Sequence, residues 1–168
     1  MVTRYMDDIL QEMKISEIDK KLTQINNLHT NLKFTIERET EGSIPFLDMK
    51  ISNIQGRLSS KWYNKPTDTG LVLNFHSLAP LRYKKSVVAG FVHRIARACS
   101  SWKNFDLSLG KAKCVLEQNQ YPPSFYNPII TKTINTIYES YQTKTKKAPQ
   151  YHFPLMKRHY RRTIQPRS

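Results

Sequence analysis

Alternating apolar and polar positions predict short strands in the first part of the chain. Val2 to Tyr5 and Ile9 to Met13 predict two strands around Met6-Asp7-Asp8, since aspartate at a hairpin tip fits turn chemistry. Further strands are expected at Lys33–Glu39, Ile44–Ser52 and Arg57–Asn64, the last two joined by a turn at Asn53-Ile54-Gln55-Gly56.

One amphipathic helix interrupts these strands. Its apolar residues recur at spacings of three and four, as on one face of a helix. They are Ile15, Ile18, Leu22, Ile25, Leu28 and Leu32. Ser16 resembles an N-cap, with Asp19 three residues later. We expect this stripe to face a core.

After Gly70 the pattern becomes helical. Proline fits the first turn of a helix, so Pro80 predicts a helix that runs to about Ser100. A second helix is expected from an Asp106 cap to Asn119, and a third from an Asn127 cap, with Pro128 first, through Tyr141. Three short helices with tight links predict a helix-turn-helix-like bundle. The whole chain is therefore expected to be α+β.

The first of these helices carries an apolar face and a basic face. At 100° per residue, the apolar side chains gather on one broad side: Val87, Val88, Phe91, Val92, Ile95, Ala96 and Cys99. Arg82, His93, Arg94 and Arg97 lie opposite, and Lys84 and Lys85 follow in the first turns, where long stems can snorkel. A helix lying along a phosphate backbone fits this pattern, and a solvated surface helix would share its periodicity.

The charge of the chain favours the helix that lies along a phosphate backbone over the solvated surface helix. The 168 residues hold 27 Lys and Arg against 13 Asp and Glu, a formal net charge of +14. Residues 69–105 and 144–168 contain no acid. Such an excess predicts an anionic partner, with nucleic acid ahead of an acidic membrane surface. Residues 144–168 lack a helical stripe and are expected to form a flexible basic tail.

Other residue types exclude several classes of protein. Cys99 and Cys114 lie in apolar, helix-like contexts, which predicts no disulfide framework and a reducing compartment. The five histidines show no metal-ligand spacing. No apolar run approaches the roughly 20 residues of a membrane span, and no signal peptide opens the chain. The expectation is an intracellular protein, nuclear or cytoplasmic.

Several segments together resemble the reverse transcriptases of Penelope-like retroelements. The matching stretches, over roughly residues 2–140, are Arg4-Tyr5-Met6-Asp7-Asp8-Ile9-Leu10, Ile44-Pro45-Phe46-Leu47-Asp48-Met49, Lys61-Trp62-Tyr63-Asn64-Lys65-Pro66-Thr67-Asp68-Thr69, Leu73-Asn74-Phe75-His76-Ser77-Leu78-Ala79-Pro80, Lys84-Lys85-Ser86-Val87-Val88, His93-Arg94-Ile95-Ala96 and Asn119-Gln120-Tyr121-Pro122. Their common order and spacing make the set specific.

The resemblance implies a partial polymerase. Residues 1–70 would be the C-terminal part of a palm, built of hairpins and one helix, and residues 71–143 a three-helix thumb of helix-turn-helix type. Asp7 would be a catalytic metal ligand for Mg²⁺ and Asp8 its supporting neighbour. The candidate contacts to a template–primer backbone are Lys61, Lys65, Arg82, Lys84, Lys85, Arg94 and Arg97.

Departures from the family limit this expectation. The earlier palm strand with its own metal-binding Asp, and the fingers, have no counterpart here, and no Gly-Ile-Tyr…Tyr-Ile-Gly endonuclease motif follows. Gln120 replaces the usual Gly of the Asn-x-Tyr-Pro phrase, which weakens the expected helix stop. Met1 is therefore expected to be internal to a longer frame, with the missing N-terminal part of the polymerase as a partner.

Two adjacent carboxylates without a third cannot fix two Mg²⁺ ions about 4 Å apart. We therefore expect no polymerase activity from this chain alone. Two other classes stay open: a stand-alone, helix-turn-helix-like nucleic-acid-binding module, and a relic without selected function.

Overall fold

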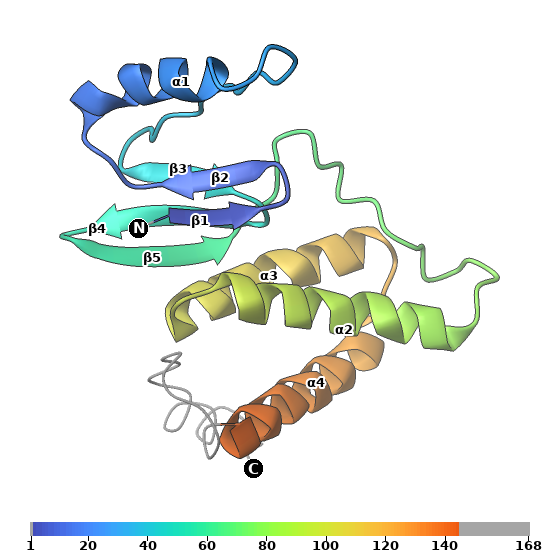
Figure 1. Ribbon diagram of the computed structural model, residues 1–168. Helices are drawn as coiled ribbons and strands as arrows, with labels where there is room; N and C mark the ends of the chain where they lie inside the picture. Colours follow the sequence, from blue (N-terminus) through green and yellow to red (C-terminus); the bar gives the residue numbers. More distant parts are fainter. Residues whose placement is uncertain (1, 145–168) are drawn as a thin grey trace.

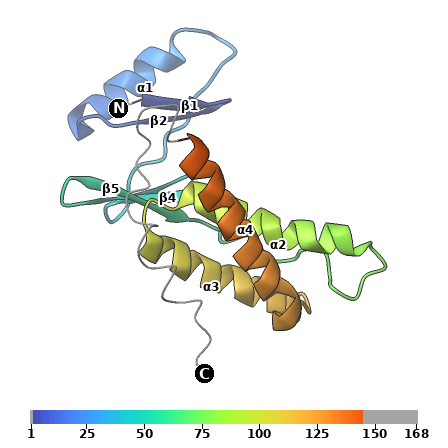
Figure 2. The same ribbon diagram turned by 90° about the horizontal axis from the view of Figure 1, so that it is seen from below.

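The computed structural model describes residues 2–144, which form an α+β fold as predicted. Within them lie two small antiparallel sheets and four α-helices. Figure 1 shows the sheets between α1 (Ile18–Asn26) and the C-terminal helices. Figure 2, seen from below, shows α1 and the β1–β2 hairpin on one side of the larger sheet, α2 and α3 on the other, and α4 crossing α2. The predicted tail at 144–168 lies outside the described residues, except for Lys144.

The first sheet is the predicted hairpin of β1 (Val2–Tyr5) and β2 (Asp8–Gln11). Tyr5 pairs with Asp8, so Met6 and Asp7 form the tip, and β2 begins one residue earlier than expected. Met6 adopts a left-handed φ of 49°. Arg4 Nε stabilises this tip by donating a hydrogen bond to the Met6 carbonyl oxygen at 2.9 Å. The adjacent carboxylates are therefore held at the end of a defined turn.

The second sheet has the order β3 (Ser43–Phe46), β4 (Met49–Ile54) and β5 (Arg57–Trp62). The prediction of one strand over Ile44–Ser52 is wrong, because the chain reverses at Leu47-Asp48 and Phe46 pairs with Met49. Leu47 adopts a φ of 54°. Leucine rarely takes this left-handed conformation, so the sequence gives no sign of a turn here. The turn between β4 and β5 narrows to Gln55-Gly56, both with positive φ, as in a type I′ hairpin.

The region around α1 differs from the sequence prediction. A 3-10 turn at Ile15–Glu17 precedes the helix, and no side-chain cap is made at either start, so Ser16 is not the N-cap. The stripe is not a core face either, since α1 has no buried residue and Leu28 and Leu32 lie beyond its end, exposed. Ile18, Leu22 and Ile25 are only partly exposed, so the apolar side of α1 is partly covered but not buried in a core.

No strand forms over Lys33–Glu39. Instead, the side chain of Asn26 takes the place of a neighbouring strand at Phe34. The Phe34 amide donates to Asn26 Oδ1 at 2.6 Å, and Asn26 Nδ2 donates to the Phe34 carbonyl at 3.1 Å. These side-chain bonds satisfy the local backbone without a ladder.

The three C-terminal helices are α2 (Leu81–Ala98), α3 (Trp102–Gln118) and α4 (Pro123–Lys144). The prediction for α2 is confirmed. The Asp106 cap is wrong, because Ser101 Oγ accepts the Asn104 amide at 3.2 Å and starts α3 earlier. The Asn127 cap is also wrong: Pro123 occupies the first position of α4, where a missing N–H is tolerated, and Pro128 lies inside the helix.

The hydrophobic core belongs to the helical part. Among the described residues, Trp62 is the only buried apolar side chain before Val88. The others are Val88, Val92, Ile95, Ala96, Ala98, Cys99, Phe105, Leu109, Ala112, Leu116, Tyr121, Tyr126, Ile130, Ile134 and Ile137. Burial of these side chains removes apolar surface from water and is the main stabilising term. The N-terminal hairpin and α1 do not share in it.

Trp62 and a few polar contacts dock the larger sheet on the helices. The Trp62 ring meets Phe91 of α2 edge-on, with centroids 5.7 Å apart. Ser60 of β5 exchanges hydrogen bonds with Ser100 between α2 and α3: its amide donates to Ser100 Oγ at 2.9 Å, and its carbonyl accepts the Ser100 amide at 3.1 Å. Thus β5 sets the position of the sheet relative to α2.

Asn119, at the end of α3, anchors the connector that leads into α2. Its side chain accepts the Val72 amide at 3.1 Å and donates to the Gly70 carbonyl at 2.8 Å. Its own carbonyl accepts the Phe75 amide at 3.0 Å. Gln120 adopts a φ of 67°, and the Tyr121 amide bonds to the Leu116 carbonyl at 3.0 Å. The helix stop therefore forms although glycine is absent.

Candidate nucleic-acid interface

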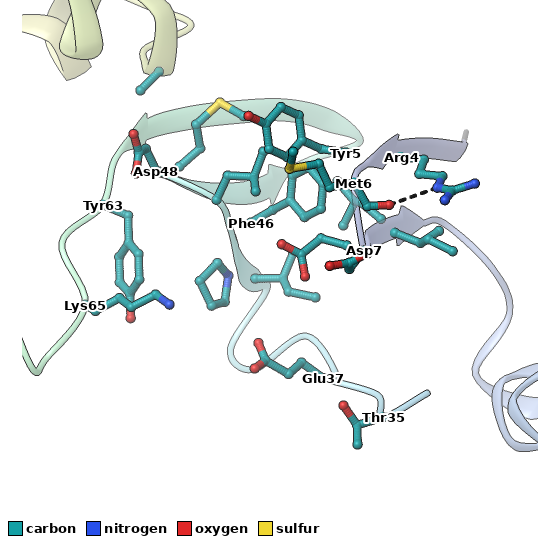
Figure 3. Close-up of a pocket in the computed structure, with 18 of the residues that line it drawn as sticks. Arg4, Tyr5, Met6, Asp7, Thr35, Glu37, Phe46, Asp48, Tyr63 and Lys65 are labelled. Carbon is teal, nitrogen blue, oxygen red and sulfur yellow. Dashed lines mark hydrogen bonds between the residues drawn. The ribbon is translucent and has the colours of Figure 1, made fainter. Parts of the chain in front are cut away.

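A groove of about 1830 Å³ lies between the β1–β2 hairpin and α2. The hairpin tip forms one wall, the exposed side of α2 forms another, and the turn between β3 and β4 lies between them. Figure 3 shows Asp7 approaching from the hairpin, with Tyr63 and Lys65 across from it and Phe46 between. The groove is open to solvent and large enough to admit a polymer strand.

The α2 wall is basic. Gly90, His93, Arg94 and Arg97 line the groove and are exposed. Spacings of three, four and seven residues put them on one stripe of the helix. Lys65 adds another cation after β5. The predicted division of α2 into a buried apolar face and a basic face is confirmed by the burial of Val88, Val92 and Ile95.

Arg94 makes an ion pair across this groove. Its Nε lies 3.5 Å from Oδ2 of Asp48, in the turn between β3 and β4. The side chains of Arg94 and Asp48 are 58% and 64% exposed, so solvent screens the pair and it stabilises the fold weakly.

A second carboxylate in this region keeps its charge readily. Hydrogen bonds from the Gly70 amide and from Asn64 lower the pKa of Asp68, and the charge of Arg94 adds to the effect. Asp68 thus stays ionised and holds the connector after β5 in place.

The opposite wall carries three carboxylates together with the bases Arg4 and Lys33. Asp7 and Asp8 are both exposed at the hairpin tip and line the groove with Glu37. No group of three or more His, Cys, Asp or Glu side chains in residues 2–144 is arranged to hold a metal ion. Asp7 and Asp8 by themselves therefore do not make a complete Mg²⁺ site, since that ion needs an ordered octahedron of oxygen ligands.

The groove brings together only part of the predicted site: Asp7, Asp8, Lys65, Arg94 and Arg97. Lys61, on β5, and Arg82 and Lys85, on α2, are exposed but do not line it. The Arg82 guanidinium lies 4.8 Å from the centroid of the Tyr83 ring, which holds it against the start of the helix.

Lys84 has a structural place instead. Only 7% of its surface is exposed. Its Nζ donates to the Ser77 carbonyl at 2.7 Å and lies 5.4 Å from the centroid of the Phe75 ring. These contacts fasten the connector to the first turn of α2.

Sequence reasoning missed Asp48 and Gly90. The ion pair of Asp48 depends on a turn that the pattern did not predict. Gly90 could have been found from the sequence. An isolated glycine inside a helical pattern weakens the helix, so it indicates a position where packing or function needs the missing side chain.

Comparison with known families finds a match in the helical part of the chain. Residues 71–131 match the family described as the animal helix-turn-helix domain, so the chain carries a domain of helix-turn-helix type. The match covers α2, α3 and the start of α4. No curated protein and no solved structure matches the chain. Among the described helices, none is both long and apolar enough to cross a membrane.

Proposed function

We propose that this protein binds nucleic acid through its helix-turn-helix-type domain, with the stripe of α2 that faces the groove as the contact surface. The observation that carries this proposal is Arg94 and Arg97 exposed together on a helix whose other face is buried. Phosphate neutralisation by such residues supplies most of the affinity of sequence-independent binding. The animal helix-turn-helix match to residues 71–131 supports the same reading.

The composition of this helix agrees with an anionic ligand. Residues 69–105 hold six Lys and Arg and no acid. A solvated surface helix would gain from acids placed three or four residues from its bases, and α2 contains none. No acid of α2 itself therefore neutralises the stripe, and its Arg94 pairs with Asp48 from the turn between β3 and β4.

A salt titration tests this proposal. Fluorescence anisotropy with duplex and single-stranded oligonucleotides would compare the wild type with Arg94→Gln/Arg97→Gln. The matched control is Lys103→Gln/Lys111→Gln, which removes two exposed charges from α3, outside the groove. We expect the α2 variant to bind more weakly. With duplex, the slope of log affinity against log salt concentration should become shallower by about 0.9 for each phosphate contact that is lost.

Two results would count against it. The wild type would bind neither oligonucleotide at low salt, or both double variants would lose affinity equally. The second result would mean that net charge, not the α2 stripe, attracts the nucleic acid.

As a second candidate function, we propose that the chain derives from an RNA-directed DNA polymerase of the Penelope-like type and needs further polypeptide for catalysis. Two features support this. Asp7 and Asp8 stand at a hairpin tip on the groove that the basic stripe also lines. The hairpin around them exposes Val2, Tyr5, Met6 and Ile9, apolar side chains that a neighbouring segment would cover.

Mg²⁺ would then bind only after another carboxylate joins Asp7 and Asp8. The experiment is to determine the 5′ extent of the native transcript and to assay its longest product for primer extension, beside Asp7→Asn. We expect an upstream frame, activity in the long product, none in residues 1–168 alone, and none after Asp7→Asn. Activity that survives Asp7→Asn, or a transcript that begins at Met1, would reject this second function.

A further inference from the structure

Gly90 is a residue that the fold itself does not require. It lies in the middle of α2, with ordinary helical neighbours on both sides. A Cβ added at this position would meet no atom within 4 Å. Glycine inside a helix is less stable than alanine because its backbone loses more freedom on folding. Helix–helix packing therefore does not explain glycine here.

The position of Gly90 gives a different reason. It is exposed and lines the groove, with His93 and Arg94 about one turn away and Arg97 about two turns away on the same stripe. Residue 90 is thus a gap in the side-chain surface, bordered by cationic and imidazole groups. A ligand can approach the helix main chain there, as it can at glycines elsewhere.

We propose that one phosphodiester strand runs along α2 from Gly90 to Arg97, in direct contact with the helix backbone at Gly90, with its phosphates held by Arg94 and Arg97. This inference rests on the proposed nucleic-acid binding and adds where the strand runs. From Gly90 to Arg97 the helix rises about 10 Å. Along the axis of a duplex one strand carries a phosphate about every 3.4 Å, so two or three successive phosphates of that strand reach the stripe.

The chain contains a matched control for this proposal. Gly110, in the middle of α3, is also exposed and would also place its Cβ in open space. It does not line the groove. Alanine at either position should favour the helix in the same way, and only alanine at position 90 should obstruct a strand.

The experiment compares the full chain with Gly90→Ala, Gly90→Gln and Gly110→Ala, using thermal unfolding and anisotropy with single-stranded and duplex oligonucleotides. We expect both alanine variants to raise Tm, by roughly 2–4 °C. Gly90→Ala should bind about tenfold more weakly and Gly90→Gln weaker still, while Gly110→Ala binds as the wild type does. In the Arg94→Gln/Arg97→Gln background, the effect of Gly90→Ala should shrink.

Two outcomes would overturn the inference while nucleic-acid binding itself stands: Gly90→Ala binding as tightly as Gly110→Ala, or Gly90→Ala lowering Tm, which would make this glycine a requirement of the fold. A wild-type protein that binds no oligonucleotide would instead reject the proposed function, and this inference with it.

Discussion

Arg94 and Asp48 face each other across the groove, with 3.5 Å between Arg94 Nε and a carboxylate oxygen of Asp48. The pair joins the middle of the basic stripe to the turn between β3 and β4. A phosphate that binds Arg94 must compete with this carboxylate. In the proposed function, Asp48 would therefore lower the affinity for nucleic acid by pairing with Arg94 in the unbound protein.

Replacing Asp48 by asparagine should raise the affinity for nucleic acid. An exposed ion pair contributes about 0.2–1 kcal/mol. We therefore expect Kd, measured by anisotropy at low salt, to fall by up to about fivefold. Asp106→Asn removes one exposed acid from α3 outside the groove and serves as the control. Equal gains in the two variants would show that net charge alone is responsible.

Lys84 should matter for stability and not for binding. Lys84→Met removes the hydrogen bond from Nζ to the Ser77 carbonyl, and a bond to a charged group contributes about 1.5–3 kcal/mol. We expect the free energy of unfolding to fall by about that amount in urea titrations, with an unchanged salt slope of binding. Lys85→Met, at an exposed position of the same turn, should change stability by less than about 0.5 kcal/mol. A lower salt slope in Lys84→Met would contradict this role.

Gln120→Gly should stabilise the protein. Gln120 holds a φ of 67°, a conformation that costs a non-glycine residue about 1 kcal/mol. Relief of this strain should raise Tm by roughly 2–4 °C. Lys111→Gly, in the helical interior of α3, should lower Tm, because glycine there weakens the helix. A decrease in both variants would mean that the Gln120 side chain is needed.

Tyr126 should make stability fall at high pH. Burial, and then the hydrogen bond and charge of Glu117, raise the pKa of Tyr126 to about 12 from an ordinary 10.0. Between these values the unfolded chain loses the phenol proton while the folded chain keeps it. The stabilisation is therefore complete below about pH 10 and is lost as the pH rises toward 12. Tyr126→Phe should flatten the fall of Tm over that range, whereas Tyr5→Phe, at an exposed position, should leave it unchanged.

Hydrophobic periodicity correctly predicted the elements that bury one regular face. The buried face of α2 around Val88, Val92 and Ile95 emerges from spacing alone. The hairpin carrying Asp7 also follows from local pattern. The strand expected at Lys33–Glu39 is wrong because Asn26 satisfies the Phe34 backbone. The long strand through Leu47 is wrong because that residue takes a left-handed turn.

The sequence by itself determined the α+β class, the basic face of α2 and the position of the two carboxylates at a turn, because each depends on near neighbours in the chain. Tertiary structure decided which of these charged groups meet. Lys84 is buried under the connector, Arg94 pairs with Asp48, and Gly90 lies open on the groove. Those relationships join residues far apart along the chain or depend on what packs around them, and no local spacing encodes them.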